Sequence, residues 1–202
     1  MGKIDENKIQ KKQRLMETSF QLFLEKGISR TTISDIAAQA GVAKGTFYLY
    51  FKDKYDLQEK LIAHKAKQLI QHALANSFYE DRKGADEKVI AIIDDILDEL
   101  QKDKKLLKFI NKNLSWGIFR RALSRSELDP IPIFAGILNV PADDPSIDVV
   151  VYMIIELVSS TAHNIILESD PVSFTNFKPW LFRSILAIIH ECLGPAQESS
   201  AT

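Results

Sequence analysis

The chain has 202 residues, of which 46% are hydrophobic, and its formal net charge is −1 at pH 7. This composition supplies enough apolar side chains for a packed core and excludes a disordered chain. Glycine and proline are scarce, and the apolar residues recur with helical rather than alternating periods, so we predict an all-α fold. The single cysteine, Cys192, excludes an intrachain disulfide and fits a reducing cytoplasm, where we expect the protein to be located.

Charge is distributed unevenly along the chain. Residues 1–60 hold 11 Lys and Arg against 8 Asp and Glu, whereas the remainder holds 15 against 19. A basic head followed by an acidic body is the polarity expected when only the head meets DNA. The polar N-terminus does not read as a signal peptide, and no apolar run approaches the roughly 20 residues of a membrane helix, so we expect no contact with a membrane.

A predicted first helix ends at Gly27, and residues 31–54 then form a predicted helix-turn-helix. Thr32 and Asp35 have the spacing of a capping box at the start of its first helix. Gly41 stands where that helix ends, because glycine enters the left-handed conformation without strain. The apolar face of this helix consists of Ile33, Ile36, Ala37 and Ala40.

The second helix of this unit is predicted to begin near Ala43 and to bury Phe47 and Phe51. Its other side carries Gly45, Tyr48, Leu49 and Lys52, flanked by Lys44 and Thr46. Small, hydroxylated and basic residues on one face are typical of a surface that approaches a phosphate backbone and base edges. A solvated helix face with an exposed tyrosine is the alternative interpretation.

Residues 9–61 resemble the DNA-binding domain of the TetR/AcrR family of bacterial transcriptional regulators. The resemblance lies in FLEKG (23–27), in TTISDIAAQAGVAKGTFYLYF (31–51) and in KDKYDL (52–57). The chain departs from the family at Ala43, where a serine is frequent, and at Tyr50, where a histidine is common.

This resemblance implies a homodimer that places two recognition helices in successive major grooves of a near-palindromic operator. Gly45, Thr46 and Tyr48 would lie nearest the base edges, and the residues expected to contact phosphates are Thr32, Ser34, Lys44, Tyr50 and Lys54. Residues 1–54 would form the DNA-binding domain, and residues 55–202 a helical body for ligand binding and dimerisation. A small-molecule effector in the body would shift the helix after Lys54 and release DNA, which makes a repressor the expected function.

The body begins with a predicted linking helix over residues 55–78 and an amphipathic helix over 87–102. The latter has Asp94, Asp95, Asp98 and Glu99 on the face opposite its apolar residues, which predicts a solvated acidic face. Over residues 106–123, large aromatics alternate with polar residues, so Phe109, Trp116 and Phe119 either line a ligand cavity or belong to a plain core. The proline-rich stretch 126–146 is predicted to be a loop with a short helix over 133–138.

Two apolar helices, over 147–167 and 177–193, are predicted to close the chain and, by the resemblance, to form the dimer interface. Glu156 and His163 share one face of the first helix and need partners there. They either bond within the body or across a dimer, or they reach a ligand, so His163 is a further candidate for ligand binding.

Enzymatic function is not expected. His190 and Glu191 begin a zinc-protease pattern, but position 194 is glycine, and the sequence contains no GxSxG, P-loop or CxxC motif. We therefore expect no catalytic residue, metal or cofactor. The alternative function is a helical module that binds a small molecule or a protein without reading DNA sequence.

Overall fold

The structure is a computed structural model that describes residues 3–76, 79–113 and 129–194. Within these ranges the chain forms helices and turns and no strand, which confirms the predicted all-α fold. The chain divides into two compact units, Met1–His64 and Lys65–Thr202, which we call the head and the body. The boundary expected at 54/55 falls where helix α4 begins, and the division into compact units falls within that helix.

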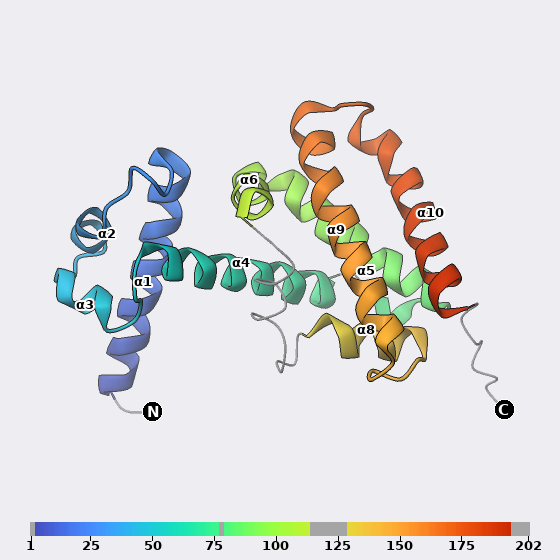
Figure 1. Ribbon diagram of the computed structural model, residues 1–202, viewed down its shortest axis with the longest axis horizontal. Coiled ribbons are helices and arrows are strands. Elements are labelled where there is room, and N and C mark those ends of the chain that lie inside the picture. The colour runs from blue at the N-terminus through green and yellow to red at the C-terminus, as the bar shows by residue number, and fades with distance from the viewer. Residues whose placement is uncertain (1–2, 77–78, 114–128, 195–202) are drawn as a thin grey trace. The chain divides into compact units, whose positions relative to one another are not determined.

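The head contains a long helix, a helix-turn-helix and the first part of α4 (Figure 1). Its helices are α1 (Lys3–Lys26), α2 (Ile33–Gln39), α3 (Lys44–Tyr48) and α4 (Lys54–Asn76). Gly27 follows α1 with φ 76°, and Gly41 forms the corner between α2 and α3 with φ 65°, as the sequence predicts. The head core is built from buried residues of all four helices: Leu15, Phe20, Leu22, Ile36, Phe47, Leu57 and Leu61.

The start of α2 is fixed by the capping box that the sequence predicts. The backbone N–H of Asp35 donates to the Thr32 hydroxyl, and the backbone N–H of Thr32 donates to the Asp35 carboxylate, both at 3.0 Å. The backbone N–H and the hydroxyl of Thr32, with the charge of Lys26, hold the pKa of Asp35 below its ordinary value.

Replacing Asp35 with alanine is expected to lower the melting temperature of the head at neutral pH and to reduce its sensitivity to acid. A depressed pKa means that the carboxylate stabilises the folded head fully above its unfolded pKa of 3.8 and loses that contribution as the pH falls through the lower folded value. Melting curves between about pH 3 and pH 7 measure this difference. A variant with the same melting temperature as the wild type at neutral pH would contradict it.

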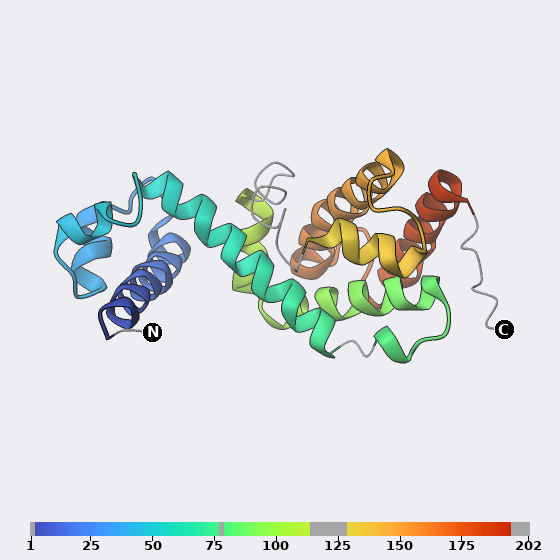
Figure 2. The same ribbon diagram turned by 90° about the horizontal axis from the view of Figure 1, so that it is seen from below.

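The body packs its helices around a single apolar core. It contains η1 (Tyr79–Asp81), α5 (Ala85–Lys102), α6 (Lys104–Asn113), α8 (Pro130–Leu138), α9 (Pro145–Glu168) and α10 (Phe174–Leu193). Figure 2 shows α8 beside both α5 and α9, and these pairs are in contact. By length and composition alone α9 could cross a membrane, but buried residues along it, from Ile147 to Ile166, belong to this core.

Two features of the body differ from the sequence prediction. Helix α8 begins at Pro130, not near residue 133, because Asp129 caps it and proline fits the first helical position. The acidic face of α5 is not wholly solvated, since Lys178 of α10 pairs with Asp94 at 2.5 Å and with Asp98. Burial by itself lowers the pKa of Lys178, but its hydrogen bonds to the two carboxylates outweigh burial and raise the pKa above its ordinary value.

Candidate functional site

The outer face of α3 is the first candidate site. Lys44, Gly45 and Tyr48 are exposed, and Tyr48 keeps 53% of its surface accessible. Leu49, directly after α3, is 78% exposed, which is high for an apolar side chain. A cationic, a small, an aromatic and an aliphatic residue therefore stand together on a surface that the head core does not cover.

The buried face of the same helix orients this surface. Phe47 is 0% exposed and Phe51 is 2% exposed, and their ring centroids lie 5.5 Å apart. The Tyr48 ring packs edge-on against Phe47, with centroids 5.4 Å apart and an interplanar angle of 80°. Ala43 precedes α3 and provides no side-chain cap, so packing by Phe47 and Phe51 is what holds this five-residue helix in place.

The other residues predicted to contact DNA lie in different environments. Ser34 is exposed on α2, and Thr32 is exposed but uses its hydroxyl in the capping box. Thr46 is half-buried. Tyr50 is also half-buried, and its ring lies 6.3 Å from that of Phe51. Thr32 and Ser34 are thus open to a phosphate, whereas Thr46 and Tyr50 are partly covered by the head.

Lys54 bonds to the head itself. Its Nζ donates to the carbonyl oxygens of Ile28, Ser29 and Thr31 at 2.8, 3.1 and 3.0 Å. An ammonium has three donors, so all three are used to join the start of α4 to the turn between α1 and α2. The resemblance implies a phosphate contact for Lys54, but the structure gives its ammonium this internal role.

Lys54→Met is expected to destabilise the head by about 1–3 kcal/mol, because the three carbonyl oxygens lose a charged donor. Urea unfolding followed by circular dichroism measures the change. Lys52→Met is the matched control, since Lys52 is exposed two positions earlier and its loss is expected to change stability by no more than about 0.5 kcal/mol. Equal unfolding midpoints for the two variants would exclude the internal role.

A second contact ties the segment after α3 to α4. Asp56 accepts a hydrogen bond from the backbone N–H of Lys52 at 2.9 Å and pairs with Lys60 Nζ at 2.8 Å. Burial acts to raise the pKa of Asp56, but these hydrogen bonds and charges outweigh it and lower the pKa. Lys60 Nζ also lies 5.4 Å from the centroid of the Phe51 ring. The segment that follows α3, at Phe51 and Lys52, is therefore anchored to the first turns of α4.

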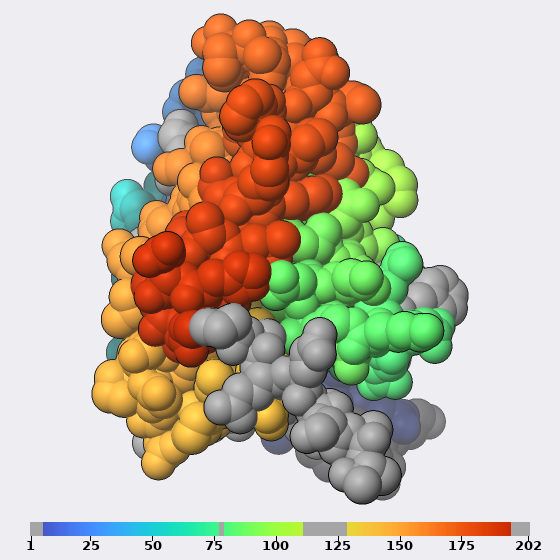
Figure 3. All heavy atoms as spheres, turned by 90° about the vertical axis from the view of Figure 1, so that its right-hand side faces the viewer, coloured from blue at the N-terminus to red at the C-terminus, as the bar shows by residue number. Residues whose placement is uncertain are grey.

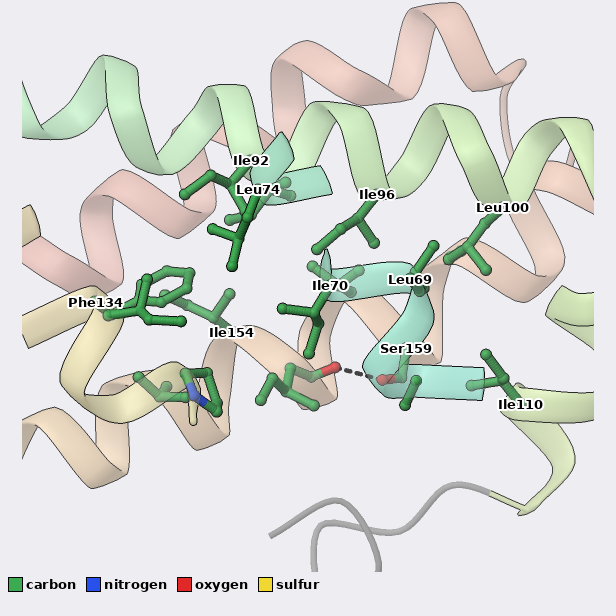
Figure 4. Close-up of a pocket in the computed structure, with 18 of the residues that line it drawn as sticks. Leu69, Ile70, Leu74, Ile92, Ile96, Leu100, Ile110, Phe134, Ile154 and Ser159 are labelled. Carbon is green, nitrogen blue, oxygen red and sulfur yellow. Dashed lines mark hydrogen bonds between the residues drawn. The ribbon is translucent and has the colours of Figure 1, made fainter. Parts of the chain in front are cut away.

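The second candidate site is a pocket in the body (Figure 4). Its walls come from α4, α5, α6, α8 and α9, and its volume is about 130 Å³. From α4 it receives Ala66, Leu69, Ile70 and Leu74, and Figure 4 shows Ile70 beside Ile96 and Ser159. Except for Ser159, every described side chain in the wall is a hydrocarbon.

Of the residues predicted to bind a ligand, Phe109 and His163 are described by the structure, and neither is among the described residues that line this pocket. Phe109 is 5% exposed and lies in the core, while its neighbour Ile110 lines the pocket. His163 follows the lining residue Ala162 but is not part of the wall, and its Nδ1 is enclosed without a hydrogen-bond partner among the residues that the structure describes. Trp116 and Phe119 lie outside the described residues. Aliphatic positions such as Ile70 and Ile155 were missed, because apolar periodicity does not distinguish a pocket wall from a filled core.

The sequence matches a family of known proteins in the head. Residues 15–61 match the model of the bacterial regulatory proteins of the tetR family. An uncharacterised HTH-type transcriptional regulator of Bacillus subtilis, YerO, is 27% identical over 152 residues, which are 66% of this chain and 52% of YerO. The fatty acid metabolism regulator protein of the same organism is 34% identical over 83 residues, covering 41% of this chain and 42% of that protein. The chain thus spans about half the length of these curated relatives.

The fold agrees with the sequence match. The regulator FadR from Bacillus subtilis, solved in complex with stearoyl-CoA, superposes with a TM-score of 0.61 over 91% of this chain and 98% of that one, at 20% identity. At that identity the agreement shows a shared fold. Residues 15–61 thus match the bacterial regulatory proteins of the tetR family, and the chain as a whole shares the fold of the regulator FadR.

Proposed function

We propose that the chain is a ligand-responsive repressor that binds a palindromic operator as a homodimer in the cytoplasm and leaves it when a small molecule enters the body. The observation that supports this proposal is that the two ends of α4 belong to different parts of the protein. Leu57 and Leu61 of this helix are buried in the head core, whereas Leu69, Ile70 and Leu74 line the pocket. One helix therefore belongs both to the DNA-binding unit and to the wall that an effector would touch, so a displaced wall biases the position of the head.

DNA binding would rest on the outer face of α3. Gly45, Thr46 and Tyr48 would lie nearest the bases, while Lys44, Ser34 and Thr32 would contact phosphates. Two such heads in a dimer would occupy major grooves roughly 34–36 Å apart. Effector binding would move the heads away from this spacing.

Selection of bound duplexes from a random pool tests this function, followed by anisotropy titrations at several salt concentrations. We expect an inverted repeat, and a salt dependence that weakens in Lys44→Ala by about one unit of slope for each lost phosphate contact. No enriched sequence, with weak binding that the mutation leaves unchanged, would overturn it. The chain would then be a helical small-molecule- or protein-binding module.

Dimerisation is proposed to use α9 and α10. Figure 3 shows α10 (red) between α9 (orange) and α5 (green) on one face of the body. Apolar residues on these helices remain exposed in the single chain: Val149 is 51%, Tyr152 42% and Trp180 65% accessible. Large exposed aromatics of this kind mark protein interaction surfaces.

Trp180→Glu is expected to weaken the dimer at least tenfold, because it replaces an aromatic anchor by a charge that an interface must desolvate. Sedimentation velocity over a range of concentrations measures the dissociation constant. Tyr55→Glu is the control, since Tyr55 is similarly exposed, at 58%, but belongs to the head. A dimer equally stable in both variants would place the interface elsewhere.

A further inference from the structure

The wall of the body pocket offers an occupant almost no polar chemistry. Among the described residues that form it, only Ser159 carries a polar side-chain atom. That hydroxyl donates to the carbonyl oxygen of Ile155 at 2.5 Å, within its own helix, as the dashed line in Figure 4 shows. A charged or hydrogen-bonding group placed in this pocket would lose its hydration without compensation.

The volume of the pocket limits the size of its occupant. Protein interiors hold few voids larger than a water molecule, and an engineered apolar cavity of about 150 Å³ stays dry and binds benzene. The present pocket, at about 130 Å³, is of the same order. It therefore accepts a ring or a short hydrocarbon segment as it stands, and a longer segment must displace side chains of the wall.

We infer that the effector is recognised through an uncharged aliphatic or alicyclic segment that enters this pocket without polar contacts, while any charged end of the molecule stays outside. This inference rests on the proposed ligand-responsive function and names the chemistry of its effector. Selectivity then depends on the length and shape of the hydrocarbon, because the wall has no group that distinguishes one polar end from another.

The same geometry links the length of the occupant to the response. Leu69, Ile70 and Leu74 of α4 form part of the wall, and Figure 4 shows them directed toward the side chains of α5 and α9. A segment that exceeds the free volume has to push some of these side chains aside. Longer occupants are therefore expected to shift α4 more than short ones and to release DNA more effectively.

Displacement of the neutral dye N-phenyl-1-naphthylamine from the full-length protein tests the ligand class. The competitors are 1-alkanols from butanol to decanol, with the carboxylate and the alkylammonium ion of equal carbon number. For the alkanols we expect affinity to rise about fourfold per methylene until the segment no longer fits. Butanoate and butylammonium are expected to bind at least about tenfold more weakly than butanol, because they are too short to leave their charge in water. Short ions that bind more tightly than the alkanol of equal length would overturn the inference.

Two isoleucines of α5 provide a matched pair of variants. Ile96 and Ile90 are both half-buried against the body core, but only Ile96 lines the pocket. Ile96→Asn is expected to weaken decanol binding at least about tenfold by placing an amide in the wall, and Ile90→Asn is expected to leave it unchanged. If melting curves show that Ile96→Asn does not fold, Ala66→Phe replaces it, since this variant fills the pocket from α4. Equal decanol affinity in the pocket variant and in Ile90→Asn would contradict the assignment.

The dye-displacement assay contains no DNA, so it tests the ligand class alone. The effect of a ligand on operator affinity tests the proposed function, and either test can fail while the other succeeds. Alkanols that bind as expected but leave operator affinity unchanged would confirm the ligand class and contradict ligand-responsive release. A charged, hydrocarbon-free molecule that releases the operator would confirm the release and overturn the ligand class.

Discussion

Phe47→Ala is expected to unfold the helix-turn-helix and abolish specific DNA binding. Phe47 is fully buried, and truncation of a buried phenylalanine lowers the free energy of unfolding by about 3–5 kcal/mol. The head is especially sensitive at this position, because α3 has five residues and no side-chain cap at its start. A helix that short has no stability of its own and depends on its contacts with Phe51 and the rest of the core.

Amide hydrogen exchange measured along the full chain tests this expectation. Protection is expected to fall in residues 33–61, while α9, whose core belongs to the body, keeps its protection. Leu49→Ala is the control, since Leu49 is 78% exposed immediately after the same helix, and its truncation is expected to change stability by no more than about 0.5 kcal/mol. Wild-type protection in Phe47→Ala would mean that packing by this ring does not hold α3.

Local rules in the sequence predicted much of the head. The capping box of Thr32 and Asp35 and the left-handed Gly41 depend on residues within a few positions of each other, so the chain specifies them directly. The internal role of Lys54 was not predictable in this way. Its acceptors lie 23 to 26 positions earlier in the chain, and only the folded head brings them to its ammonium.

In the body too, the helices were predictable from local sequence, whereas the pocket depends on how the helices pack. Each predicted helix over the described residues is present, with bounds that shift by a few positions. At Pro130 the shift arises because proline at a first turn was interpreted as part of a loop, whereas at α10 the side chain of Ser173 caps a start three residues before the predicted one. The pocket was not located, because a pocket is volume that side chains leave empty, and periodicity reports only which residues are apolar. Phe109 was predicted to line a ligand cavity because it lies among aromatic and polar residues. The described wall is instead formed mainly by aliphatic residues such as Ile70 and Ile155.

The apolar wall of the pocket also suits the proposed response to a ligand. An apolar occupant of this volume of about 130 Å³ removes hydrocarbon surface of its own and of the wall from water, which favours binding. Part of the wall is contributed by α4, whose first turns are anchored to the head through Lys54 and Asp56. In the proposed function, the free energy gained on filling the pocket would bias α4, which leads from the head into the pocket wall.

Tyr48→Ala is expected to weaken specific DNA binding while leaving the fold intact. The ring is 53% exposed on the outer face of α3, so its loss removes little buried surface from the head core. A side chain that reads base edges contributes roughly 1–3 kcal/mol per half-site, and a dimer with two half-sites is then expected to lose at least about tenfold in affinity. Anisotropy titration with the selected operator measures the loss, and melting curves check the fold.

Two further tyrosine variants show whether a loss of affinity is specific to position 48 and whether it comes from the ring or from the hydroxyl. Tyr55→Ala removes an equally exposed ring from the head, outside α3, and is expected to keep wild-type affinity for the operator. Tyr48→Phe retains the ring and removes only the hydroxyl. Affinity retained in Tyr48→Phe would indicate apolar contact with bases, whereas loss in both Tyr48 variants would indicate a hydrogen bond from the phenol. Unfolding of Tyr48→Ala at ordinary temperature, or an unchanged affinity for the operator, would remove Tyr48 from the recognition surface.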